Sequence, residues 1–130
     1  MKGVVADTSE WVEYLANRPA PVFRQWLETG NIVVPAVVVT ELTSGARTRE
    51  EQMVIEDLLS DLRMHDCSFH ACARAGELRR TLRAKGISVS TLDAQVAQCA
   101  IDRDEQLLTR DAIFWKIAAH TKLRMASAPT

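Results

Sequence analysis

Short apolar runs rich in β-branched residues alternate with longer segments of helical periodicity, and this alternation restricts the possible fold more than any other feature of the chain. Strands that alternate with helices are typical of α/β proteins with a mainly parallel sheet. Right-handed crossovers between such strands place helices on both faces of the sheet. Because helical segments outnumber the apolar runs, we expect a small sheet of four or five strands.

The apolar runs predict strands over residues 3–6, 32–34, 64–68, 106–109 and 123–126. Helices are predicted over 10–17, a short stretch closed by Gly30, 36–46, 49–63, 70–84, 91–103 and 112–120. The segment 36–46 is ambiguous, because Val37-Val38-Val39 alone favours a strand, whereas the spacing of Val37, Glu41 and Ala46 favours a helix. The residues from 126 to 130 are expected to form a fraying tail.

With 130 residues, 47% of them hydrophobic, the chain is expected to form a single domain, residues 1–130. A net charge of −1 argues against a nucleic-acid binder that is basic over its whole surface, although a local basic patch is compatible with it. We find no pattern of a signal peptide or membrane span. Three cysteines, an odd number, fit reduced thiols, so we expect a cytoplasmic protein that does not engage a membrane.

Four acidic residues lie where an apolar run ends or a helix begins: Asp7, Glu41, Asp93 and Asp111. In an open parallel sheet, ligands bind beyond the carboxyl ends of the strands. Asp7 directly follows a predicted strand, Asp111 lies two residues past the strand 106–109, and Asp93 lies in the first turn of a helix that leads into that strand. Glu41 lies five residues into the helix that leaves the second strand, about 7–8 Å along its axis. We therefore expect all four carboxylates at one edge of the sheet.

Converging carboxylates need compensation, because two like charges about 4 Å apart repel by a few kcal/mol at an effective dielectric constant near 20. Either some of them bind protons or a cation lies among them. An all-oxygen ligand set suits Mg²⁺ or Mn²⁺. Such an ion, when bound to a phosphate, activates a water and stabilises the leaving oxygen.

Each acid also has an ordinary structural interpretation. Asp7 and Asp111 are placed to cap the helices that follow them, and Asp93 is placed to complete a capping box with Ser90. Glu41 is harder to explain this way, since an unpaired carboxylate among valines and Leu42 is costly. The convergence of four acids favours a site over four independent caps.

The segments Val4-Val5-Ala6-Asp7-Thr8-Ser9, Thr40-Glu41-Leu42, Leu92-Asp93-Ala94 and Leu107-Leu108-Thr109-Arg110-Asp111 resemble the motifs of the PIN-domain ribonucleases. The small size resembles the toxins of VapBC toxin–antitoxin systems. The resemblance extends over nearly the whole chain, with the motifs in the same order. Each motif is weak by itself, but the ordered set is fairly specific.

This resemblance implies a three-layer α/β/α sandwich and Mg²⁺- or Mn²⁺-dependent cleavage of RNA. It carries catalysis and metal binding onto Asp7, Glu41, Asp93 and Asp111, and suggests that the Thr8 hydroxyl supports the metal shell. It further implies a small antitoxin partner whose C-terminal segment lies over the site, and a toxin homodimer.

The chain departs from the family pattern at Ile113, where many relatives carry another acid. A second metal ion would have one ligand fewer here, so a tightly held two-metal site is not implied. Phosphate charge could be neutralised by Arg110, Lys116 or Arg47, and ordinary solvated surface charge is the alternative for each.

Other features of the sequence offer competing interpretations. The segment 65–72 contains two histidines and two cysteines, but their spacing matches no common structural zinc pattern. The three tryptophans at positions 11, 26 and 115 fit core or interface packing better than base stacking. The apolar stripe of the helix 49–63 is expected to lie mostly in the core, with any excess serving a dimer or an antitoxin.

Two other functions of α/β proteins are less well supported by the sequence. A receiver-like phosphorylation domain calls for paired acids near Asp7 and a lysine at a late strand end, and neither is present. A haloacid-dehalogenase-type phosphatase calls for a second acid at position 9, which is Ser9. The alternative that stays open is a catalytically weak PIN-like module that binds RNA or protein.

Overall fold

The computed structural model of the protein describes residues 2–127. Four strands form one sheet in the order β3-β2-β1-β4, and every pairing between them is parallel. The strands are β1 (Val4–Ala6), β2 (Ile32–Pro35), β3 (Arg63–His65) and β4 (Gln106–Leu108). The predicted α/β class with a small parallel sheet is therefore confirmed.

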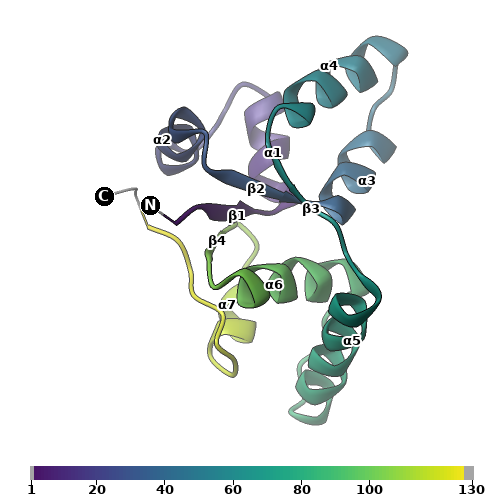
Figure 1. Cartoon of the computed structure of the whole chain (residues 1–130), viewed down its shortest axis with the longest axis vertical. Helices are drawn as coiled ribbons and strands as arrows, with labels where there is room; N and C mark the ends of the chain where they lie inside the picture. The colour runs from purple at the N-terminus through teal and green to yellow at the C-terminus, as the bar shows by residue number, and fades with distance from the viewer. Residues whose placement is uncertain (1, 128–130) are drawn as a thin grey trace.

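Helices enclose the sheet from both sides. They are α1 (Thr8–Leu15), α2 (Pro21–Thr29), α3 (Ala36–Ser44), α4 (Arg49–Ser60), α5 (Phe69–Ala84), α6 (Thr91–Arg103) and α7 (Ile113–Ala118). Helices α1 to α4 lie to one side of the sheet, and α5, α6 and α7 lie to the other (Figure 1). This is the α/β/α sandwich that the resemblance implied, and the ambiguous segment 36–46 is a helix.

The prediction of a last strand over 123–126 was wrong. Met125 forms a single isolated parallel bridge with Leu107, closed by two backbone bonds: Leu107 N–H to the Arg124 carbonyl at 2.9 Å and Ala126 N–H to the Leu107 carbonyl at 2.8 Å. One bridge does not make a strand, so this segment lies against β4 without extending the sheet. Of the predicted tail, residues 128–130 lie outside the described part of the chain.

Other boundaries shift because side chains cap the helices. The strand predicted over 64–68 ends at His65, because Ser68 accepts a hydrogen bond from Ala71 N–H at 3.1 Å and so begins α5. Helix α1 begins at Thr8, two residues before the prediction, because Asp7 caps it. Helix α4 ends at Ser60, so that β3 can begin at Arg63.

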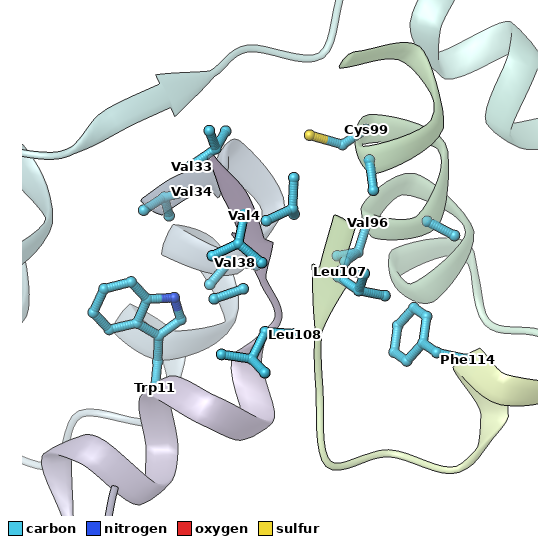
Figure 2. Packing of buried hydrophobic residues seen from close by; sticks show 14 of the residues in the cluster. Val4, Trp11, Val33, Val34, Val38, Val96, Cys99, Leu107, Leu108 and Phe114 are labelled. Carbon is cyan, nitrogen blue, oxygen red and sulfur yellow. The ribbon is translucent and has the colours of Figure 1, made fainter. Parts of the chain in front are cut away.

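The core lies on both faces of the two central strands, β1 and β2, every residue of which is buried. Figure 2 shows Trp11 and Val38 packed on one side of Val4, and Val96 with Phe114 near Leu107 on the other. Trp11 meets Phe23 edge to face, with ring centroids 5.0 Å apart. The edge strand β3 is more exposed. In the part of the chain that the structure describes, no helix has the length and hydrophobicity to cross a membrane.

Candidate active site at the carboxyl edge of the sheet

Asp7 directly follows β1 and is buried. Its backbone N–H donates to the Leu108 carbonyl at 3.1 Å, which fixes it against β4. One carboxylate oxygen, Oδ1, accepts from the Ser9 N–H at 3.0 Å and from the Ser9 hydroxyl at 2.5 Å. The other, Oδ2, accepts from the Thr109 hydroxyl at 2.7 Å. Burial raises the pKa of Asp7, and these hydrogen bonds oppose the rise without cancelling it.

Glu41 comes to the same edge from α3. The Thr8 hydroxyl, in the first turn of α1, donates to Glu41 Oε1 at 2.7 Å. This bond joins the helix that follows β1 to the helix that follows β2. Thr8 thus gives the Glu41 carboxylate a hydrogen-bond partner, although α3 places this carboxylate beside an apolar face.

Asp93 lies in the first turn of α6. Its N–H donates to the Ser90 hydroxyl at 3.1 Å, so Ser90 caps the helix. Burial raises the pKa of Asp93, a hydrogen bond with the Ser90 side chain lowers it, and the negative charges of Asp111 and Glu41 raise it further. Three of the predicted acids, Glu41, Asp93 and Asp111, are thus close enough for their charges to interact.

Asp111 is joined to Asp7 through Thr109. The Thr109 Oγ1 atom accepts from the Asp111 N–H at 3.0 Å while its hydroxyl donates to Asp7. The Asp111 carboxylate accepts from the Ile113 N–H at 3.1 Å, at the start of α7. Asp7 and Asp111 therefore act at helix starts and also belong to the convergent acidic group, so the two interpretations of these residues do not exclude each other.

The donor set has the chemistry that Mg²⁺ or Mn²⁺ prefers, since it is all oxygen and its charges repel one another. Among residues 2–127, no three acidic, histidine or cysteine side chains are close enough to one another to ligate one ion together. Mg²⁺ keeps several waters and takes one or two carboxylates directly. An ion held here would therefore meet some of these carboxylates through water.

Arg110, predicted as one candidate for neutralising phosphate charge, lies against α1. Its backbone N–H donates to the Ser9 hydroxyl at 3.0 Å, and its guanidinium lies 3.8 Å from Glu13 Oε2. Sequence reasoning missed the frame that Ser9 and Thr109 build around Asp7. The signal was available, because both hydroxyls stand two residues from a predicted acid.

Glu10 is an acidic residue near this frame that sequence reasoning also missed. It is only 2% exposed, and its Oε2 atom has no hydrogen-bond partner among the described residues. Burial raises its pKa, the positive charge of Arg110 opposes that rise, and the charges of Asp7 and Glu13 add to it. No pattern in the sequence predicts that Glu10 is buried rather than exposed to solvent.

The competing features have structural roles. Trp11 and Trp26 are buried in the core, whereas Trp115 is half exposed. Cys67 and Cys72, offered as zinc ligands, interact with each other: burial and a hydrogen bond between the two side chains raise the pKa of Cys67 to about 11. His65 Nδ1 lies 3.5 Å from Arg103 Nη1.

An apolar groove of about 420 Å³ adjoins the acidic group. It lies between α1, α3 and α4, and Val12, Leu15 and Val54 line it with partly exposed side chains. Glu41 and Thr8 also line it, so the groove and the acidic group share a border. The stripe on α4 is therefore divided: Ile55 and Leu59 are buried, whereas Val54 faces this groove.

A parallel sheet with acids gathered at its carboxyl edge is the arrangement of a PIN domain, and the PIN domain family model matches residues 4–120. Ribonuclease VapC11 from Mycobacterium tuberculosis is 31% identical over 131 residues, which covers 95% of this chain and 98% of that protein. VapC ribonuclease Mb1587 from Mycobacterium bovis matches to the same extent. The chain belongs to the PIN domain family and, within it, to the VapC ribonucleases.

Solved structures show the same fold. The DNA-bound VapBC structure from Salmonella typhimurium superposes with a TM-score of 0.83 at 23% identity, covering 97% of this chain and 98% of that chain. VapBC2 from Rickettsia felis, bound to a promoter DNA fragment, gives a TM-score of 0.79 at 24% identity over 95% of this chain and 96% of that one.

Proposed function

We propose that this chain is a single-domain, Mg²⁺- or Mn²⁺-dependent endoribonuclease that acts as the toxin of a toxin–antitoxin pair. The observation that carries the proposal is the shared field of Glu41, Asp93 and Asp111, which adds to burial in raising the pKa of Asp93 and which a cation would relieve. The names of the relatives, VapC ribonucleases, support RNA as the substrate.

In this mechanism, Asp7, Glu41, Asp93 and Asp111 would hold the ion, in part through water. Activation of a water and neutralisation of charge on the phosphodiester would be the chemistry that the bound ion supplies. Ser9 and Thr109 fix Asp7 by three hydrogen bonds, so its carboxylate does not reorient during the reaction. Thr8 orients Glu41 in the same way. Ile113 contributes no fifth acid, so we propose no tightly held second ion.

The test is cleavage of total RNA by purified protein with Mg²⁺, beside EDTA and the Asp93→Asn variant. Asp57→Asn is a matched control, because Asp57 is an exposed aspartate on α4 outside the site. We expect cleavage by the wild type and Asp57→Asn, and none with EDTA or Asp93→Asn. If no RNA is cut and neither Mg²⁺ nor Mn²⁺ binds the folded protein, the chain is the alternative, a PIN-like binding module.

We further propose that the groove between α1, α3 and α4 receives a segment of a small antitoxin. Solved relatives are toxin–antitoxin complexes, which supports a partner of that kind. Apolar side chains such as Val54 suit an amphipathic helix. Glu41, Glu50 and Glu51 on the groove wall favour basic residues in that helix. Val54→Glu should weaken capture of the cognate antitoxin while leaving cleavage by the free toxin unchanged.

A homodimer and a cytoplasmic location complete the proposal. The edge strand β3 exposes Met64 beside a hollow formed with α3, which suits a second copy of the chain. The three cysteines are unpaired thiols, which suits a reducing compartment. Light scattering of the purified protein tests the dimer, and Met64→Glu should shift it toward the monomer.

A further inference from the structure

A cationic hollow lies at the amino edge of the sheet, at the opposite edge from the acidic site. It has a volume of about 570 Å³. Basic side chains from four segments line it: Lys2, Arg63, Arg74 and Arg103. Two carboxylates, Asp102 and Glu105, lie among them, and Lys2 forms an ion pair with a third, that of Asp104. The four cations therefore outnumber these three carboxylates by one, although the whole chain is slightly acidic.

Buried Glu105 organises this hollow. Its Oε1 accepts from Arg103 Nε at 2.7 Å, and its Oε2 accepts from the Gly3 N–H at 2.6 Å and lies 3.7 Å from Arg63 Nη1. Arg63 Nη1 also donates to the Asn31 side chain at 2.6 Å. The guanidiniums are thus fixed before any ligand arrives, which reduces the entropy lost on binding.

Arg74 is fixed from α5 in a second way. Its Nε and Nη2 atoms donate to the Asp102 carboxylate, the shortest contact being 2.8 Å, while Gln98 donates to the same carboxylate at 2.9 Å. A guanidinium carries five N–H donors, more than these contacts use. Its side chain is about half exposed, so the remaining donors face the hollow or solvent.

Phe69, the residue after Ser68 on the wall of the hollow, is 81% exposed, more than any other large hydrophobic side chain in the part of the chain described. Phe69 does not itself line the hollow, but it directly follows a residue that does. A solvent-exposed aromatic ring and a nearby group of fixed cations are the two components that bind single-stranded nucleic acid: cations meet phosphates, and a base stacks on the ring. The ring of His70 lies edge to face with Phe69, its centroid 5.4 Å away, and supports that orientation.

We propose that this hollow and Phe69 form a second binding site for single-stranded RNA, distinct from the acidic site. Phosphates would lie against Arg63 and Arg74, and one base would stack on Phe69. The two sites stand at opposite ends of α6, whose residues 93 and 103 are about 15 Å apart along the helix axis. The choice of RNA rests on the proposed function, but binding here does not depend on cleavage.

The test is binding of a fluorescent single-stranded RNA in EDTA, which prevents metal-dependent cleavage, over a range of salt concentrations. Arg74→Gln should weaken binding and reduce the slope of log affinity against log salt by about 0.7 for each phosphate that the arginine neutralises in the wild type. Phe69→Ala should weaken binding about fivefold or more and leave the slope unchanged. Arg80→Gln is the matched control, an exposed arginine on the same helix, and should bind like the wild type.

Circular dichroism of each variant shows whether it folds, and Lys2→Gln offers a further charge removal at an exposed position. A parallel titration with inorganic phosphate, followed by ³¹P NMR, separates the sources of the anion. If Arg74→Gln loses phosphate binding but binds RNA like the wild type, the hollow takes free phosphate and the proposal is overturned. Equal RNA binding by the wild type, Arg74→Gln and Phe69→Ala also overturns it. Because binding is measured in EDTA, a wild-type protein that cuts no RNA would still show whether Arg74→Gln and Phe69→Ala weaken binding, so failure of the proposed cleavage is distinguishable from failure of this proposal.

Discussion

Gly3 offers a stringent test of how tightly the amino edge of the sheet is packed. A Cβ atom at this position would lie 2.3 Å from the Asn31 carbonyl oxygen, 2.7 Å from Glu105 Oε2 and 2.8 Å from Arg63 Nη1. The first of these atoms belongs to the backbone, and it accepts the Val4 N–H at 3.0 Å, the bond where β1 meets the chain leading into β2. Gly3→Ala therefore cannot be accommodated by rotating a side chain.

Overpacking of this kind typically costs about 1–3 kcal/mol, and displacement of backbone favours the upper end. We expect Gly3→Ala to lower the free energy of unfolding by about 3 kcal/mol, a large part of the roughly 5–15 kcal/mol that holds a typical domain together. Urea denaturation followed by tryptophan fluorescence measures the decrease, since Trp11 and Trp26 are buried. The midpoint should fall with little change in the denaturant slope.

Gly76→Ala is the matched control. Gly76 is exposed within α5, and a Cβ there would meet nothing within 4 Å. The same substitution should raise the free energy of unfolding by about 1 kcal/mol, because alanine favours the helix over glycine. A Gly3→Ala protein within about 0.5 kcal/mol of the wild type would refute the reasoning, since about 0.5 kcal/mol is the usual scatter of neutral surface changes.

Three further predictions concern the acidic site. The pKa of Asp93 is raised in the folded state, so its ionised form destabilises the fold. Asp93→Asn should therefore raise the melting temperature of the metal-free protein at neutral pH. This gain should vanish as the pH falls toward 3.8, the ordinary pKa of an aspartate, because the carboxyl group is then protonated in both the folded and the unfolded state. Ser90→Ala should lower the free energy of unfolding by about 1 kcal/mol, because Ser90 caps α6. Metal-dependent cleavage should be retained, which would distinguish the structural role of Ser90 from the catalytic role of Asp93. Cleavage abolished as fully as in Asp93→Asn would contradict this. Thr109→Val removes the donor to buried Asp7 and should cost about 1–3 kcal/mol in denaturation, with weaker Mn²⁺ binding by calorimetry; unchanged Mn²⁺ affinity would show that Thr109 does not position Asp7.

The sequence predicted the parallel architecture well because apolar runs and helical periodicity agree along most of the chain. It was wrong at 123–126, where an apolar alternation suggests a strand but only Met125 pairs with β4. Whether such a segment pairs along its length depends on how it meets the assembled sheet, which no local pattern reports. Three of the four predicted acids share one field, and hydrogen bonds through Thr109 join Asp7 to Asp111. Their role as ligands stays a prediction.

What periodicity could not predict is the state of individual polar groups. Glu10 occupies a helical position next to Trp11, and its burial follows from how α1 packs, which no local pattern reports. Glu105 is similar, because two of its three partners, Gly3 and Arg63, come from distant segments that only the fold brings together. The cationic hollow could therefore not be predicted from the sequence, whose net charge is −1.

Helix α6 explains how one small sheet can hold opposite charges at its two edges. Its N-terminal turn carries Asp93, and its C-terminal turn carries Asp102 and Arg103. Its middle is fixed, since Val96 and Ala97 are buried in the core. A rigid helix of this kind sets the distance between the acidic site and the cationic hollow. If both proposals hold, one strand of RNA that contacts both would have to span that distance. Binding in the hollow would then supply affinity and orientation, while the acids supply the chemistry.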